Sequence, residues 1–241
     1  MIYCNNMYTQ YIYRPLFNLI IFLQNVVPSH DLGIVIIFLA FLVRLVFYPL
    51  TKKSLRVQKT LNQLQPEIKK IQEQYKNNKE EQGRKVMELY KGHKVNPMSG
   101  CLPVLIQLPI MIALYQILRQ NLGDQAFHLY SFVGMAGETN YLFLGLINLA
   151  VPNIMLSFLA GISQFFSTKL TMPKAEKSKE KKEKFNFQTQ MMYLSPFLTF
   201  FISLKLSSGL ALFWASTNIF MVLQQVLADH YSKKSPESKK L

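Results

Sequence analysis

Residues 32–50 read LGIVIIFLAFLVRLVFYPL, and this apolar run decides what kind of protein the chain is. It contains one charged residue, Arg44, and it ends at Pro49, just before the basic pair Lys52-Lys53. A helix of about 20 mostly apolar residues is long enough to cross the hydrocarbon core of a bilayer. The run therefore predicts a membrane-spanning helix that carries a single arginine.

Two more apolar runs follow in the middle of the chain. Residues 97–118 contain Pro103 and Pro109. A membrane bundle tolerates such prolines because neighbouring groups satisfy the backbone carbonyls that they free. The other run predicts a third span at about 151–168, with Pro152 in its first turn.

The C-terminal apolar stretch, residues 190–228, is too long for one spanning helix. The sequence KLSSG at 205–209 interrupts it, so we expect two helices joined tightly at this point. The predicted fold is thus an all-α integral membrane protein with five transmembrane helices. The five spans form a core at 32–228, between an N-terminal segment at 1–31 and a tail at 229–241.

The apolar run at 14–27, RPLFNLIIFLQNVV, is too short to cross a bilayer comfortably. Asn18, Gln24 and Asn25 add polar groups to it. Such a segment favours a helix that lies on the membrane surface. Ser29 or Asp31 could then cap the helix that follows.

Residues 52–95 are polar and highly charged, but one apolar stripe runs through their first half. Asn77-Asn78 predicts a turn, and a second, shorter apolar pattern follows it. These patterns predict a helical hairpin that stands off the membrane. The stripe consists of Leu61, Leu64, Ile68, Ile71 and Tyr75, and the second pattern of Val86, Leu89 and Tyr90.

Charge is distributed unevenly along a chain that is 50% hydrophobic and yet carries a formal net charge of +14. Most of its Lys and Arg lie in three segments: the hairpin at 52–95, a flexible basic loop at 169–189, and a tail at 229–241 that we expect to be disordered. Five crossings put all three segments on one side of the membrane. The positive-inside rule then orients the N-terminus out and the C-terminus in. The remaining four basic residues are Arg14, Arg44, Arg119 and Lys205.

Arg44 is the strongest candidate for a functional residue. A charge inside a spanning helix is costly, so it usually faces a partner or a water-filled cavity. No acidic residue falls within a predicted span, which favours water or lipid phosphate over a buried ion pair. The alternative is that Arg44 extends along the helix to the cytoplasmic headgroups.

Several polar residues on the other predicted spans could share a cavity with Arg44. They could instead form hydrogen bonds between helices, which are common in membrane bundles. Trp214 could anchor its helix at the membrane interface or form a wall of the cavity. The candidates for the groove are Arg44, Gln107, Trp214, Asn218 and Gln225, with Gln224 nearby.

No catalytic or metal-binding pattern is found in the sequence. The four His and two Cys have no ligand spacing, so we expect no cofactor, no metal and no enzymatic chemistry. Cys101 is expected to be a buried, inert thiol. Only three residues precede Cys4, so no signal peptide and no lipidation of Cys4 are expected. The basic segments could bind anionic lipid, ribosomal RNA or protein, or could simply be solvated.

The order of these features resembles that of the YidC family of membrane insertases, which includes mitochondrial and chloroplast relatives. The resemblance covers nearly all of residues 13–228. It rests on the segments YRPLFNLIIFLQNV, HDLGIVII, RLVFYPLTKKSLR, LQPEIKKIQEQY, NPMSGCLPVLIQLPIMIALYQIL and GLALFWASTNIFMVLQQ.

The resemblance implies a hydrophilic groove within five spans, open to the cytoplasm and the lipid and closed on the outer side. Arg44 matches the groove arginine of the family, and Gln107 and Trp214 occupy positions that resemble other groove-lining residues. A hairpin at about 52–92 would help to receive substrates. The implied partners are nascent membrane proteins, the ribosome, the Sec translocon and the lipid bilayer, with no specific DNA. The implied location is the bacterial cytoplasmic membrane.

Two functions follow from these expectations. The first is an insertase and chaperone, which moves short polar flanks of substrates through the groove and releases hydrophobic segments sideways into lipid. The alternative is a channel, transporter or lipid scramblase that uses the same polar groove. Transporters often show paired intramembrane charges and inverted repeats. The sequence has one such charge and no repeat, which favours the insertase.

Overall fold

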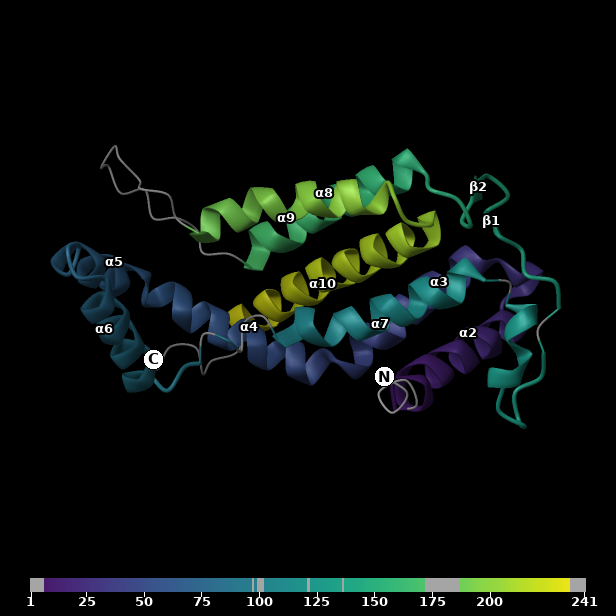
Figure 1. Ribbon diagram of the computed structural model, residues 1–241, viewed down its shortest axis with the longest axis horizontal. Helices are drawn as coiled ribbons and strands as arrows, with labels where there is room; N and C mark the ends of the chain where they lie inside the picture. The colour runs from purple at the N-terminus through teal and green to yellow at the C-terminus, as the bar shows by residue number, and fades with distance from the viewer. Residues whose placement is uncertain are drawn as a thin grey trace. The chain divides into compact units, whose positions relative to one another are not determined.

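The computed structural model describes residues 7–96, 98, 102–120, 122–135, 137–171 and 187–234 of the chain, and these residues are mostly helical (Figure 1). The chain divides into two compact units. The first unit comprises Met1–Val46, Leu108–Leu170 and Lys182–Leu241, and the second comprises Phe47–Gln107 and Thr171–Lys181. Cys4 and Cys101 lie outside the described residues, as does most of the predicted basic loop at 169–189.

The first unit begins with a π-helical turn, η1 (Thr9–Tyr13), that continues into α2 (Arg14–Val26). This confirms the short helix predicted at 14–27. One face of α2 is buried, including Phe17, Ile20 and Ile21, whereas Phe22 and Val26 are exposed. The polar side chains of Asn18 and Gln24 lie on the buried face, so the helix is not divided simply into an apolar inner face and a polar outer face.

A short 3-10 turn, η2 (Pro28–His30), leads to the central helix α3 (Leu32–Val46). Asp31 caps α3, because its Oδ1 accepts the backbone N–H groups of Gly33 at 2.8 Å and Ile34 at 3.3 Å. Ser29, the other predicted cap, lies in the preceding turn with a φ of 66°. Asp31, one of the two caps predicted from the sequence, is therefore the cap of α3.

Apart from Arg44, α3 is apolar on every side, and among the described residues only one side of it is covered by protein. It packs along α10 (Ser208–Lys234) and against α2. The buried side carries residues at helical spacing, among them Leu32, Ile36 and Leu39, while Phe38 and Phe41 are exposed. A helix that is hydrophobic all round belongs in a core or in a membrane. The exposed apolar half of α3 therefore fits contact with lipid.

The first predicted span ends earlier than expected. The helix breaks at Phe47, and α4 (Tyr48–Gln63) begins with Pro49 in its first turn. A proline disfavours the helical conformation of the residue before it and clashes with the carbonyl four positions earlier. The prediction that one helix continues through residue 50 is therefore wrong, because the effect of Pro49 reaches back along the chain.

The segment between the second and third spans contains the largest departure from the all-α prediction. After α7 (Leu102–Arg119), the chain forms the 3-10 helix η4 (Gly123–His128) and a two-stranded hairpin of β1 (Leu142–Phe143) and β2 (Ile147–Asn148). The strands are antiparallel, with Phe143 paired to Ile147. Gly145 in the connecting turn has a φ of 72°, which glycine adopts without steric cost.

The helix that follows the hairpin lies where the third span was predicted, at about 151–168, but it begins later than expected. α8 (Ile154–Thr171) is capped by Asn153, whose Oδ1 accepts the N–H groups of Met155 and Leu156. Pro152 thus precedes the cap and does not lie in the first turn as predicted. Asn153 sets the start of α8, because its short side chain can accept hydrogen bonds from the first free N–H groups of the helix.

The predicted break in the C-terminal stretch is confirmed. α9 (Phe187–Ser203) and α10 are separate helices joined at 204–207. α10 continues to Lys234, so the tail predicted to be disordered from residue 229 begins as helix; the rest of it, 235–241, lies outside the described residues. The helix α10 continues through residues 229–234 because this polar segment contains neither proline nor glycine.

The second unit confirms the predicted helical hairpin. α4 is followed by α5 (Gln65–Gln74), a turn at 75–78, and α6 (Lys79–Gly92), which packs against α5. Asn78 caps α6 by accepting the N–H group of Glu81 at 3.1 Å. Within the predicted apolar stripe, Leu64 and Ile68 are buried. Local turn chemistry and one apolar stripe are thus enough to define this unit.

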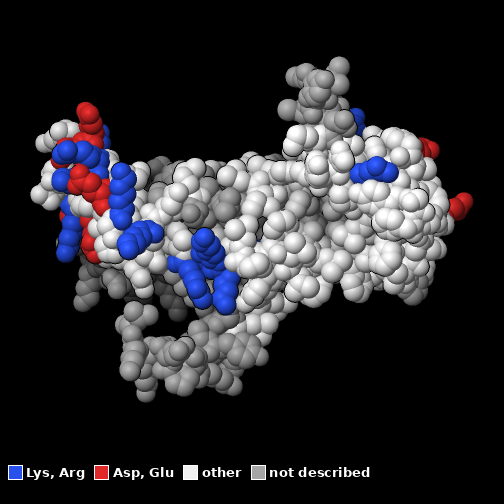
Figure 2. Space-filling model, turned by 90° about the horizontal axis from the view of Figure 1, so that it is seen from below, with Lys and Arg blue, Asp and Glu red and all other residues white. Residues whose placement is uncertain are grey.

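Only part of the predicted span count is supported by helix length. Among the described residues, one unbroken helix, Ser208–Leu227, is both long enough and apolar enough to cross a membrane. Leu105–Arg119, Ile154–Leu170 and Tyr193–Ser203 are shorter apolar helices. Figure 2 shows that Lys and Arg gather on the part of the surface formed by α4 to α6, whereas much of the remaining visible surface carries no charge. The number of five spans stays a prediction.

Candidate functional site

Arg44 lies near the C-terminal end of α3 and points toward the neighbouring helix. Its Nε donates a hydrogen bond to the backbone oxygen of Thr217 at 3.0 Å, midway along the apolar part of α10. Among the described residues, its Nη groups have no hydrogen-bond partner, and no carboxylate lies within ion-pair distance. The side chain is partly exposed, so the guanidinium retains free donors beside the middle of α10.

Trp214 and Asn218 lie one helical turn apart on α10, and both bind the same residue of α8. The Nε1 of Trp214 donates to the Oε1 of Gln164 at 3.3 Å, and the Nδ2 of Asn218 donates to that oxygen at 3.0 Å. Asn218 also approaches the hydroxyl of Ser163 at 3.4 Å. The structure thus joins two predicted groove residues through Gln164.

The polar contacts continue from Gln164 along α8 to α9. The Nε2 of Gln164 donates to the hydroxyl of Thr168 at 3.2 Å, and that hydroxyl lies 3.5 Å from the hydroxyl of Ser195. We call Ser163, Gln164, Thr168, Ser195, Trp214 and Asn218 the polar track. Side chains at several positions of three helices therefore offer hydrogen-bond donors and acceptors along otherwise apolar helices.

Gln164 was not among the predicted groove residues, although the sequence contains a signal for it. Gln164 and Thr168 are four positions apart within an otherwise apolar helix, so they share a face. What the sequence alone does not give is the register of α8 against α10, which brings Gln164 to Trp214 and Asn218.

The other predicted groove residues do not belong to the polar track. Gln225 is buried on α10, on the same side as Asn218, as their spacing predicts. The Oε1 of Gln224 is buried and has no hydrogen-bond partner in the part of the chain that the structure describes. Gln107 belongs to the second unit, and its Nε2 has no partner among the described residues. The participation of Gln107 in a common groove stays a prediction.

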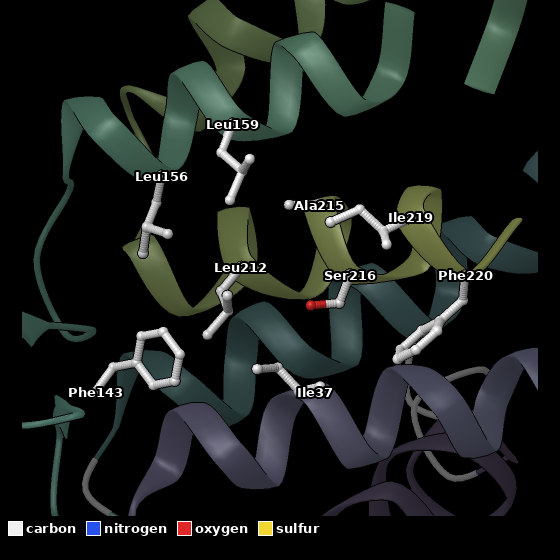
Figure 3. A pocket seen from close by; sticks show the side chains of 9 residues that line it. All are labelled: Ile37, Phe143, Leu156, Leu159, Leu212, Ala215, Ser216, Ile219 and Phe220. Atoms are coloured by element: carbon white, nitrogen blue, oxygen red, sulfur yellow. The ribbon is translucent and has the colours of Figure 1, made fainter. Parts of the chain in front are cut away.

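A pocket of about 290 Å³ lies between α3, the hairpin, α8 and α10 (Figure 3). Its wall is apolar except for the hydroxyl of Ser216. None of the five predicted groove residues lines it. The lining residues are Ile37, Phe143, Leu156, Leu159, Leu212, Ala215, Ser216, Ile219 and Phe220. The pocket can therefore receive apolar groups. Trp214 and Asn218, the polar-track residues of α10, lie on another face of that helix.

The end of the first unit at which α3 and α10 begin is closed by hydrogen bonds from buried polar side chains. Besides capping α3, Asp31 accepts the N–H group of Leu144 through Oδ2 at 2.8 Å. The Ser208 hydroxyl donates to the carbonyl of Asn148 at 2.8 Å. Gly33 allows the hairpin to approach, because a Cβ at this position would lie 2.1 Å from the ring of Phe143. We call these contacts the hairpin clamp.

A second set of contacts ties η4 to α2, and we call it the η4 clamp. Arg14 donates to the carbonyls of His128 and Leu129 at 3.0 and 3.1 Å, and Asn18 binds His128 and the N–H group of Tyr130. The ring of His128 packs edge-on against Tyr13. Burial, and then the nearby charge of Arg14, lowers the pKa of His128 below its ordinary value. Burial raises the pKa of Tyr13.

Two ion pairs on α6 join residues that are close in the sequence. Arg84 binds Glu81 at 2.6 Å, and Lys85 binds Glu88 at 2.9 Å, each pair three positions apart. The hydrogen bond from Lys85 lowers the pKa of the Glu88 carboxyl. Exposed pairs of this kind contribute little to stability. The described residues contain no group of three or more His, Cys, Asp or Glu that could hold a metal ion.

Comparisons with known proteins agree with the resemblance noted in the sequence. The profile of the family described as 60Kd inner membrane protein matches residues 22–235. The chain is 33% identical over 213 residues to the membrane protein insertase YidC of Clostridium tetani, and the match covers 88% of each chain. It is 35% identical over 200 residues to the membrane protein insertase YidC of Francisella philomiragia and to that of Francisella tularensis subsp. novicida.

The coverage of the relatives differs. The match includes 83% of this chain but only 33% of the length of each of these Francisella proteins, so the chain corresponds to about a third of them. With a family profile that matches most of its length, and a relative matched almost end to end, the chain belongs to the 60Kd inner membrane protein family.

Proposed function

We propose that this chain is a membrane protein insertase, which moves short polar flanks of its substrates through a hydrophilic groove and releases their hydrophobic segments sideways into lipid. The family is one of non-enzymatic insertases, so the chain is not an enzyme. The relatives that carry the insertase name match at 33% and 35% identity. We propose that the chain also acts as a chaperone for these substrates.

The observation that carries the mechanism is the unpaired guanidinium of Arg44. It binds one backbone carbonyl of α10, and no acidic side chain among the described residues neutralises it. A cation in surroundings of low dielectric attracts an anionic group more strongly than a cation in water does. An acidic flank of a substrate would therefore be drawn toward the middle of α10, which shortens its path through hydrocarbon.

The polar track supplies the second part of the mechanism. A polar flank without hydrogen-bond partners is costly to move into an apolar medium. Gln164 and Asn218 provide amide groups that, with water, could replace part of the lost hydration. The apolar pocket between α3, α8 and α10 suits the hydrophobic side chains of the same substrate. Their burial in lipid would then drive release, at about 25 cal/mol per Å².

We propose that the substrates are nascent membrane proteins and that the chain lies in the bacterial cytoplasmic membrane with its N-terminus out and its C-terminus in. The exposed, charged α5–α6 hairpin is a candidate receiver for substrates, the ribosome or the Sec translocon, because such a surface is accessible from water. A five-span core places this hairpin on the inner side by the positive-inside rule.

The proposed function can be tested in liposomes that contain the purified protein. A single-span substrate with an acidic flank is added, and insertion is measured as protection of the flank from external protease. We expect protection with the wild type, reduced protection with Arg44→Ala, and wild-type protection with Arg119→Ala, which removes an exposed arginine at the end of α7. Equal protection with wild-type and empty liposomes would contradict the proposal.

The channel and transporter alternative requires a separate readout. The same liposomes are loaded with a small fluorescent solute, and its efflux is followed without substrate protein. An insertase that holds only a partial groove should leave efflux at the level of empty liposomes. Efflux that depends on the protein would favour the channel reading.

A further inference from the structure

The loop between α7 and α8 exposes large apolar side chains to an unusual degree. Phe132 is 82% exposed and Leu146 is 83% exposed, with Phe127 at 76% and Leu144 at 63%. In contrast, residues 122–149 contain no Lys or Arg and only two acidic residues. Large apolar side chains exposed in this way mark a contact with a partner or with a membrane.

The loop cannot fold inward to bury these side chains, because hydrogen bonds hold the backbone of both its halves in place. In the first half, the N–H group of Tyr130 donates to the Oδ1 of Asn18 at 2.7 Å. In the second half, Asp31 holds the N–H group of Leu144 at 2.8 Å. The exposed side chains are therefore held outward by the hairpin clamp and the η4 clamp.

The hairpin itself has two different faces. Phe143 and Ile147 form a cross-strand pair that is partly buried, and Phe143 lines the pocket between the helices (Figure 3). Leu142, Leu144 and Leu146 are exposed on its other face and in its turn. An apolar outer face is the reverse of what a hairpin in water shows, where alternation puts polar residues outside.

The position of the loop indicates what covers this surface. The loop connects two apolar helices, and its fixed partners lie on α2 and at the starts of α3 and α10. In Figure 1 the hairpin and η4 lie at this same end of the first unit, on opposite sides of α3. Apolar groups on two sides of one helix end suit a surrounding lipid surface better than the single footprint of a protein partner.

We propose that residues 123–135 and 137–148 form a membrane-interface anchor, whose exposed aromatic and leucine side chains insert between lipid headgroups at the level of α2. Phenylalanine and leucine side chains are typical of the apolar faces that protein segments bury at the boundary between headgroups and acyl chains. The contact is apolar in origin, since the loop has no basic residue to attract anionic lipid. The anchor would hold the closed end of the first unit at a fixed depth.

The test uses the fact that Trp214 is the one tryptophan in the chain. In a Trp214→Phe background, a reporter is introduced as Phe132→Trp or Leu146→Trp, with Met87→Trp on the exposed surface of α6 as the aqueous control. The proteins are reconstituted in vesicles of phosphatidylcholine and phosphatidylglycerol that carry bromine near the headgroup or near the chain end. Retention of the wild-type thermal transition in detergent shows that each variant is folded.

For both loop reporters, we expect emission at shorter wavelength than for Met87→Trp and stronger quenching by bromine near the headgroup. Emission equal to that of Met87→Trp, without quenching, would overturn the proposal in favour of an aqueous loop. Short-wavelength emission without quenching would overturn it in favour of cover by protein. Stronger quenching by bromine at the chain end would also overturn it, since the loop would then lie in the hydrocarbon.

A spin label provides a second, independent measurement. It is attached at Leu144→Cys in a background with Cys4→Ser and Cys101→Ser, and its collisions with oxygen and with a water-soluble nickel chelate are compared. We expect the label to be more accessible to oxygen than a label at Met87→Cys. Equal or greater accessibility to nickel would contradict the membrane anchor.

Discussion

The two units of the chain are both helical, but different interactions hold them together. In the first unit, α3 packs along α10, and buried polar side chains such as Asp31 and Asn18 join segments more than a hundred residues apart. In the second unit, a short turn joins α5 to α6, few of the described apolar residues are buried, and two ion pairs lie within α6, each between residues three positions apart. We therefore expect contacts between distant segments to dominate the stability of the first unit, and contacts between sequence neighbours to dominate that of the second unit.

Loss of the Asp31 carboxylate should have the largest effect on stability. Asp31→Ala removes the cap of α3 and the acceptor of the Leu144 N–H group. We expect it to lower the free energy of unfolding by about 2–4 kcal/mol, since a cap contributes ~1 and a hydrogen bond to a charged group ~1.5–3. The measurement is denaturant titration in detergent followed by Trp214 fluorescence. Asp124→Ala, at an exposed carboxylate of η4, should cause little change.

A pair of glycine substitutions compares the two units directly. Gly33→Ala places a Cβ against the ring of Phe143, so we expect a loss of about 1–3 kcal/mol from overpacking. Gly83→Ala lies in open space within α6 and should stabilise that helix by about 0.5–1 kcal/mol, because alanine has the higher helix propensity. Hydrogen exchange of each unit separates the effects. If both substitutions destabilised the protein, the proposed difference between the two units would be contradicted.

Acid should weaken the η4 clamp. Because the pKa of His128 is lowered in the folded protein, the unfolded loop binds a proton more tightly. The stabilisation is fully present above the ordinary His pKa of 6.5 and declines as the pH falls below it. We expect faster hydrogen exchange at the N–H group of Tyr130, after correction for the intrinsic rate, when the pH is lowered through this range. His128→Phe keeps the ring contact with Tyr13 and should remove the pH dependence.

The smallest effect is expected on the surface of α6. Arg84→Ala breaks the exposed pair with Glu81, and such pairs are screened by water and salt. Thermal unfolding should be indistinguishable from that of the wild type. A clear loss of stability would mean that the second unit depends on its charges more than its exposure suggests.

The sequence predicts the helices of this chain well and their ends less well. Apolar runs and the turn at Asn77-Asn78 are local signals, and they predicted α2, α3, α7 to α10 and the hairpin of the second unit. The errors at Pro49 and Pro152 arose because a proline affects residues before it, and a cap residue such as Asn153 can set the start of a helix. The β-hairpin was missed because its strands of two residues are too short to show an alternating pattern.

The candidate site could be predicted in part. Arg44 was identifiable because it is a lone charge in an apolar run, and Asn218 and Gln225 because they share a helix face. Gln164 depends on the register between α8 and α10, and the clamp residues Asn18 and Asp31 depend on where a distant loop returns. Such contacts between distant segments are set by packing of the whole unit, which a local pattern does not encode.

The central claim is that the charge of Arg44 selects the flank of the substrate. It is tested most directly by reversing both charges in the liposome assay: wild type and Arg44→Glu are each given substrates that differ only in an acidic or a basic flank. We predict that the wild type protects the acidic flank better and that Arg44→Glu protects the basic flank better. The same preference in both proteins would contradict an electrostatic role for Arg44.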